Sequence, residues 1–160
     1  MNFPTSVKSG FSNYANFKGR ASRSEFWWFF LFSQLLQTLA QDVPGSVASI
    51  ASLALLIPSL SVHARRLHDS GRSIRWLLWL IASAVGVAIA FAGLLMQTAQ
   101  TIANLDAEQL FDNGSQFWIF IMFISVISFI IGFVVNLVFF LMPSDSEMNK
   151  YGPPPAPSTI

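Results

Sequence analysis

The chain has 160 residues, of which 53% are hydrophobic and only 11% are charged. Soluble domains carry about 25% charged residues, so this composition excludes an ordinary water-covered globular domain and indicates a membrane protein. The chain contains no cysteine, which excludes disulfides, thiolate nucleophiles and cysteine-ligated metals.

The charges alternate in sign along the chain. All nine lysines and arginines lie in three stretches with a net charge of +5, before the first apolar run, between the second and third runs, and in the tail. The two intervening stretches hold only acids: Asp42, Asp106, Glu108 and Asp112. Because cytoplasmic loops carry the excess of Lys and Arg, this alternation predicts four membrane spans with both termini in the cytoplasm.

The basic stretch before the first apolar run is aromatic as well. Phe11, Tyr14 and Phe17 recur every three residues, which fits either a short amphipathic segment on the inner leaflet or an ordinary polar leader. Ser22 to Glu25 fits a capping box, in which Ser22 caps the first helix and Glu25 reaches back to it. No signal-peptide cleavage site is evident after the first run, so we expect an uncleaved span.

Four apolar runs predict an all-α transmembrane domain. We expect a leader at 1–25, a transmembrane domain at 26–142 and a Pro-rich cytoplasmic tail at 143–160. At about 1.5 Å per residue the last three runs cover the roughly 30 Å hydrocarbon core, whereas the first is short and must borrow residues from the leader. The predicted spans of this four-helix bundle are 26–41, 43–62, 76–96 and 117–142, with a tight turn at 42–45 and a short helix at 104–111 in the outer loop.

Polar residues within the spans are few. Gln34 and Gln37 share one face of the first span, and Asn136 is the single amide of the fourth. We expect these amides to form hydrogen bonds between helices, although the same stripes are those expected of a small transporter. Charged residues are absent at mid-depth, which argues against an ion-coupled transporter. Small residues allow the third span to approach another helix of the chain or of a homo-oligomer: Ala82, Gly86 and Ala90.

Three ordered segments lie on the predicted cytoplasmic side. They are Phe17-Lys18-Gly19-Arg20-Ala21-Ser22-Arg23-Ser24-Glu25-Phe26-Trp27, then Arg65-Arg66-Leu67-His68-Asp69-Ser70-Gly71-Arg72-Ser73, then Asn149-Lys150-Tyr151-Gly152-Pro153. Through these segments the chain resembles the family called domain of unknown function 805, which are small bacterial inner-membrane proteins. The resemblance implies a multi-pass inner-membrane protein with four helices, and it implies no reaction. The chain departs from the family pattern at Ile74 and Arg75, where Gly and Trp are usual.

Because all three segments are predicted on one face, we expect them to meet there. Arginine presents a planar fork of donors that matches phosphate and carboxylate, so the face is expected to bind anionic phospholipid headgroups or a protein partner. The candidate anion-binding residues are Arg20, Arg23, Arg65, Arg66 and Arg72. The residues expected to shape the three segments are Gly19, Ser22, Glu25, Gly71, Asn149, Tyr151 and Gly152.

The alternative is a membrane-embedded enzyme or carrier for a phosphorylated, lipid-linked substrate. His68 and Asp69 are the candidate catalytic residues, but as sequence neighbours on a helix their side chains diverge. His63, five residues away, is off the helix face needed for a metal shared with His68, so we expect no metal site. We also expect no cofactor and no nucleic-acid partner. A simpler role is local, in which Asp69, Ser70 and Gly71 end the helix that continues the second span.

Overall fold

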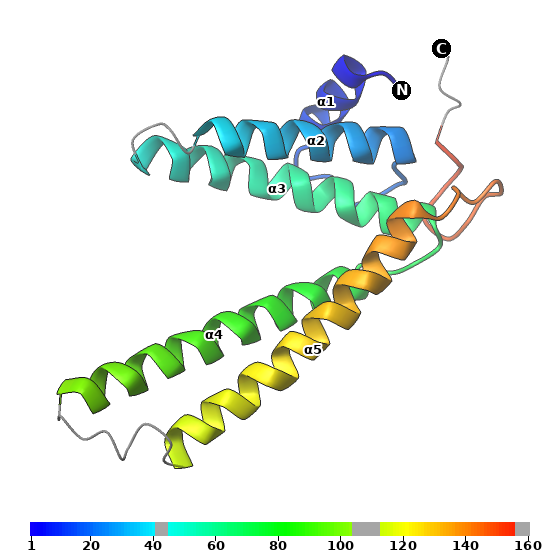
Figure 1. The fold of residues 1–160 in the computed structure, drawn as a ribbon. Coiled ribbons are helices and arrows are strands. Elements are labelled where there is room, and N and C mark those ends of the chain that lie inside the picture. Colours follow the sequence, from blue (N-terminus) through cyan, green and yellow to red (C-terminus); the bar gives the residue numbers. More distant parts are fainter. Residues whose placement is uncertain (41–44, 104–112, 156–160) are drawn as a thin grey trace. The chain divides into compact units, whose positions relative to one another are not determined.

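The computed structural model describes residues 1–40, 45–103 and 113–155, and within them the regular elements are α-helices (Figure 1). The helices are α1 (Phe3–Ser12), α2 (Arg23–Ala40), α3 (Gly45–Asp69), α4 (Arg75–Ala103) and α5 (Asn113–Leu141). The chain forms two compact units, Met1–Ile74 with Val138–Ile160, and Arg75–Leu137. Three predicted features lie outside the described ranges: residues 42–44 of the turn between the first two spans, the outer-loop helix at 104–111, and the four acids of the two non-basic stretches.

The N-terminal leader contains a helix of its own. Asn2 caps α1, because its side chain accepts a hydrogen bond from the Thr5 amide at 3.1 Å. The aromatic side chains that hold α1 on α2 are Phe3, against Trp28 and Phe32, and Phe11, against Phe29 and Phe32. The sequence predicted either a short amphipathic segment or an ordinary polar leader from the spacing of Phe11, Tyr14 and Phe17, and of these three only Phe11 lies in α1. The helix ends at Ser12, and its first aromatic contact is Phe3.

Helix α2 begins where the sequence predicts. The Ser22 hydroxyl accepts a hydrogen bond from the Glu25 amide at 3.2 Å, which confirms Ser22 as the N-cap. The reciprocal half of the predicted capping box was wrong, because the Glu25 carboxylate does not reach back. It accepts hydrogen bonds from Ser9 at 2.8 Å and from Arg65 at 2.9 Å instead. Glu25 therefore links three helices and does not act as a local cap.

Helix α3 runs seven residues past the predicted end of the second span and stops at Asp69. Its last turn is closed by bonds from the Gly71 amide to the His68 carbonyl, 3.0 Å, and from the Arg72 amide to the Leu67 carbonyl, 2.9 Å. This is a Schellman end with Gly71 in the left-handed region at φ 72°. The predicted helix end at Asp69 to Gly71 is confirmed, and the turn forms despite Ile74 and Arg75.

In the second unit, α4 packs on α5 through small residues and one amide. The Gly86 position faces the Ser125 side chain, and the Gly93 position faces the Trp118 ring. Asn136 donates to the Trp76 carbonyl of α4 at 3.1 Å, so its predicted interhelical hydrogen bond is confirmed. The corresponding prediction for α2 was wrong within its unit, where Gln34 and Gln37 are exposed.

Helices α4 and α5 are both long and apolar enough to cross a membrane. Each has 29 residues, and their most apolar windows have mean hydropathies of 2.3 and 2.8. Their outward side chains are large, apolar and exposed, as lipid-facing side chains are. The exposed side chains of α5 include Phe120, Phe123, Ile130 and Phe133.

We predict that Gly10→Ala destabilises the protein by about 1–3 kcal/mol, the usual cost of overpacking. A Cβ at Gly10 would lie 2.2 Å from the ring of Phe29, which is 1% exposed and has no room to retreat. Thermal unfolding in detergent, followed by circular dichroism, measures the change. Gly45→Ala is the matched control, since nothing lies within 4 Å of a Cβ there. Equal stability of the two variants would contradict the close packing of α1 on α2 at Gly10 and Phe29.

Candidate functional site

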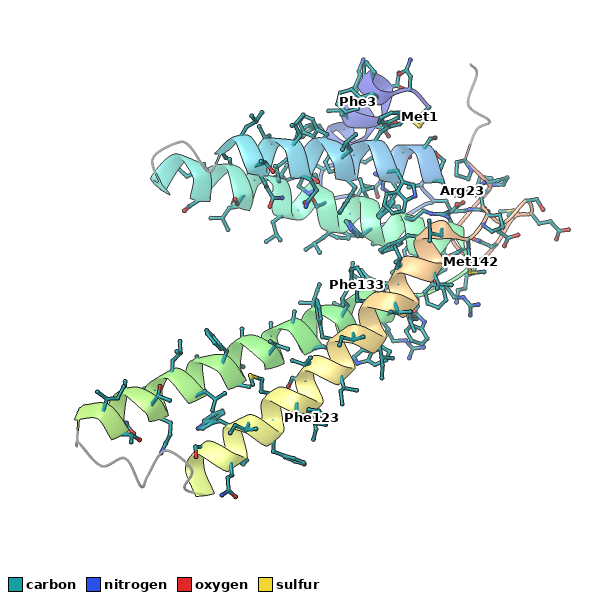
Figure 2. The ribbon with its side chains drawn as sticks, in the orientation of Figure 1. Met1, Phe3, Arg23, Phe123, Phe133 and Met142 are labelled. Atoms are coloured by element: carbon teal, nitrogen blue, oxygen red, sulfur yellow. The ribbon has the colours of Figure 1, made fainter. Side chains whose placement is uncertain are left out.

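The three sequence segments meet at the C-terminal end of α3, in the first unit. Arg20, from the segment before α2, pairs with Asp69 at 2.9 Å. The same guanidinium donates to the Gly152 carbonyl of the third segment at 3.3 Å, and also to the carbonyls of Glu147, at 2.8 Å, and Asp145 just before it. We call residues 145–153 the C-terminal segment. Figure 2 labels Arg23 and Met142 at this end of the first unit. One arginine therefore bonds to both of the other segments.

The Asp69 carboxylate lies at the centre of this arrangement. Its Oδ1 accepts from Arg20 Nε, and its Oδ2 accepts from Arg66 Nη1. The side chains of Asp69 and Arg66 are completely buried, and that of Arg20 is 1% exposed. Two cations on one carboxylate leave a buried net positive charge, which must be stabilised by further acceptors.

Those further acceptors are backbone carbonyls at the end of α5. Arg66 donates to the Phe140 carbonyl at 3.1 and 3.2 Å and to the Met142 carbonyl. The last carbonyls of a helix have no partner within the helix and form the negative end of its dipole. Burial lowers the pKa of Arg66, and the charge of Asp69 opposes this shift. Arg66 thus serves as a C-terminal cap for α5.

Arg65 points to the other side of α3. Its Nη1 pairs with Glu25 at 2.9 Å, and both side chains are 5% exposed. Its backbone carbonyl accepts from the Ala21 amide at 3.0 Å. These two arginines are adjacent in the sequence but have different partners. Arg65 bonds to the start of α2, and Arg66 bonds to the end of α5.

His68 is covered by the C-terminal segment. Its ring stacks on the Tyr151 ring with centroids 3.8 Å apart and planes 9° apart, and its Nδ1 lies 3.3 Å from the Gly19 carbonyl. Asn149 donates to the His68 carbonyl at 3.0 Å. Burial lowers the pKa of His68; the Gly19 hydrogen bond opposes this shift, and the charge of Lys150 adds to it.

Two glycines predicted to shape these segments have left-handed backbones. Gly19 has a backbone φ of 82° and Gly152 one of 126°, values that residues with a Cβ rarely adopt. Gly152 also forms a two-residue bridge with Asn149. This turn places the Tyr151 ring on the ring of His68, so Gly152 and Asn149 position the segment.

The five candidate anion-binding arginines differ in exposure. Counted with their backbone atoms, Arg20, Arg65 and Arg66 are 8%, 4% and 0% exposed. Arg23 and Arg72, in contrast, are exposed residues. The Arg72 guanidinium lies over the Phe139 ring at 4.9 Å, a cation–π contact that limits its motion. Only two of the five can therefore reach a ligand without rearrangement of the unit.

The candidate catalytic pair is engaged elsewhere. Asp69 has both oxygens in ion pairs, and His68 bonds to Gly19 and stacks on Tyr151 without contacting Asp69. His63 bonds the Ser59 carbonyl and packs on Phe26 and Phe140. In the described part of the chain, no three His, Cys, Asp or Glu residues are grouped as a metal site.

Some members of this arrangement have no sequence signal. The carbonyls of Phe140, Met142, Asp145 and Glu147 bind arginines as backbone, so side-chain patterns could not reveal them. Ser9 was also missed, although it bonds Glu25 across α1 and α2. Its position on the α2-facing side of α1 becomes predictable only once that helix is placed.

Comparison with known proteins shows the family of this chain. Residues 14–105 match the family described as "Protein of unknown function (DUF805)", so the chain belongs to this family. The matched residues include Arg20, Arg66 and Asp69, whereas the carbonyls at the end of α5 and in the C-terminal segment lie beyond them.

Two relatives come from Escherichia coli strain K12. The chain is 33% identical to "Inner membrane protein YhaH", in an alignment that covers 46% of this chain and 70% of that protein. It is also 33% identical to "Inner membrane protein YhaI", over 46% of this chain and 69% of that protein. The comparison with solved structures gives no match.

We predict that Asp69→Asn destabilises the protein by about 3–5 kcal/mol, because it leaves two buried guanidinium groups without a counter-charge. Glu147→Gln makes the same change of charge at an exposed side chain, so we expect little effect there. Chemical or thermal unfolding in detergent gives the two values. A loss no greater for Asp69→Asn than for Glu147→Gln would show that the buried ion pairs do not hold the unit together.

The lowered pKa of His68 predicts a loss of stability in acid. Unfolded His68 binds a proton near its usual pKa of 6.5, while the folded protein resists protonation. The unfolded state therefore binds more protons as the pH falls through 6.5, and stability decreases from that point down to the lower folded pKa. Melting temperatures between about pH 7.5 and pH 5 should fall less steeply in His68→Gln, in which His63 still titrates. Parallel curves would contradict the prediction.

Proposed function

We propose that this protein is a non-enzymatic integral inner-membrane protein whose exposed arginines bind anionic phospholipid headgroups. In the proposed topology α2, α3, α4 and α5 cross the membrane, and both termini lie in the cytoplasm. The alternation of basic and acidic stretches supports this orientation. The inner-membrane names of YhaH and YhaI support the location, and the apolar length of α4 and α5 supports the last two crossings.

The observation that carries the lipid proposal is the difference between buried and exposed arginines. Arg20, Arg65 and Arg66 are buried and paired with Asp69 or Glu25, so their guanidinium groups are not accessible to a ligand. Arg23 follows the N-cap of α2, and Arg72 follows the end of α3. Both positions are on the basic side of the proposed topology, where a guanidinium at headgroup depth attracts anionic lipid.

The buried arginines have a supporting role in this proposal. By binding the C-terminal segment and the end of α5, Arg20 and Arg66 fix the backbone that carries Arg23 and Arg72. The order of Arg65, Arg66, His68 and Asp69 is then explained by folding, since each of these side chains has its own partner. An enzyme built on His68 and Asp69 would need these side chains released from the contacts that hold them.

We predict that Arg23→Gln with Arg72→Gln weakens retention of anionic phospholipid. Each basic residue near an anionic surface contributes about 1 kcal/mol, so the loss of two corresponds to roughly thirtyfold weaker binding. Native mass spectrometry of the purified protein, with added anionic or zwitterionic phospholipid, measures the retained lipid. We expect the double variant to lose anionic lipid while zwitterionic lipid is unchanged.

The matched control is Lys8→Gln with Lys18→Gln, which removes the same net charge from exposed leader residues. If both double variants lose lipid equally, the effect is one of overall charge and does not belong to Arg23 and Arg72. If neither loses lipid, the headgroup proposal is wrong.

A further inference from the structure

A hydrogen bond from Tyr14 joins the N-terminal leader to the middle of α3. Pro58 lies inside α3 and has no amide hydrogen, so the Ala54 carbonyl lacks the donor that a regular helix would supply four residues on. The Tyr14 hydroxyl donates to this carbonyl at 2.6 Å. Tyr14 therefore replaces the bond that Pro58 removes.

The turn that follows α1 is fixed beside α3 at a second point. The Ser61 hydroxyl lies 2.8 Å from the carbonyls of both Asn13 and Asn16. Ser61 is seven residues from Ala54, or about 10 Å along a helix. The turn thus lies at the level of Ser61, and the Tyr14 ring reaches along α3 toward Ala54.

Helix α1 contacts α2 well beyond its first turn. Phe32, which contacts both Phe3 and Phe11, is nine residues after the start of α2, or about 13 Å along it. Figure 2 labels Phe3, at the start of α1, and Met1 just before it, and the Met1 amine donates to the Ser24 hydroxyl at 3.0 Å. The leader therefore lies along the apolar part of the α2–α3 hairpin and not ahead of it.

The aromatic side chains of the leader remain partly uncovered in the first unit. Phe3, Phe11 and Phe17 are 37%, 42% and 38% exposed. An exposed row of phenylalanines beside an apolar hairpin fits the boundary between acyl chains and headgroups, where amphipathic helices insert their apolar face. In water, this exposed apolar surface would cost free energy in proportion to its area.

From this placement we infer that residues 1–17 form an arm embedded in the inner leaflet, with phospholipid acyl chains as its partner and the Tyr14–Ala54 bond as its anchor. This inference rests on the proposed topology, in which the α2–α3 hairpin crosses the membrane. The arm covers the weak point that Pro58 creates in α3. It also explains why a hydroxyl that ordinarily stays at the interface reaches into the apolar level of the hairpin.

Because the chain lacks cysteine, single cysteines can report depth without background. We propose a nitroxide at Phe17→Cys in vesicles of mixed zwitterionic and anionic phospholipid, with its exposure to oxygen and to a water-soluble nickel chelate measured. An embedded arm makes the label more accessible to oxygen than to the chelate. A label at Ser146→Cys, in the C-terminal segment, should show the opposite. Equal chelate access at both positions would overturn the inference.

A second labelling experiment tests the topology independently of the position of the arm. An impermeant maleimide should modify Ser146→Cys and Gln100→Cys, at the far end of α4, from opposite sides of oriented vesicles. Labelling of both from one side would refute the proposed topology, whatever the depth of Phe17. Labelling from opposite sides with a water-exposed Phe17 would refute only the arm.

The anchor is tested by a double-mutant cycle. Tyr14→Phe removes the hydroxyl and keeps the ring, so we expect a lower melting temperature and greater chelate access at position 17. Pro58→Ala restores the amide that the Ala54 carbonyl lacks, so Tyr14→Phe should then have a smaller effect. The same loss in both backgrounds would show that the hydroxyl does not compensate for Pro58.

Discussion

The first unit depends on the burial of the Asp69 carboxylate between two guanidinium groups. Burying one charge is costly unless it is paired and hydrogen-bonded, and here three charges are buried with a net charge of +1. The structure satisfies them with carbonyls at the end of α5 and in the C-terminal segment. Each segment is therefore required by the others. Without the C-terminal carbonyls, Arg20 and Arg66 would be buried with unpaired donors.

This constraint changes the meaning of a cluster of arginines. In sequence, Arg65 and Arg66 are equivalent cations, and both are good candidates for binding phosphate. In the folded chain they lie on different sides of α3 and serve two separate contacts, one with Glu25 and one with Asp69. Membrane proteins pair intramembrane or juxtamembrane charges in this way because unpaired ones are expensive at low dielectric. The charge available to a ligand is then smaller than the number of arginines suggests.

Local patterns predicted the features that depend on neighbouring residues and missed those that depend on distant ones. The apolar runs located α2 to α5, and the Ser22 cap and the Gly71 turn were predicted because each depends on neighbouring residues. The aromatic spacing in the leader did not locate α1, since the position of this helix is decided by contacts of Phe3 and Phe11 with α2. Glu25 was assigned to its own helix end, because the competing partners Ser9 and Arg65 are 16 and 40 residues away.

Composition and charge order alone determined that this is a helical membrane protein, because 53% hydrophobic residues in long runs cannot form a water-covered domain. The three motifs likewise determined which family it belongs to, and their convergence was predicted from the side on which they lie. Only the tertiary structure decided which arginines are exposed. That decision depends on carbonyls some 75 residues or more beyond Arg66 and about 125 beyond Arg20, and a backbone carbonyl leaves no mark in a sequence of side chains.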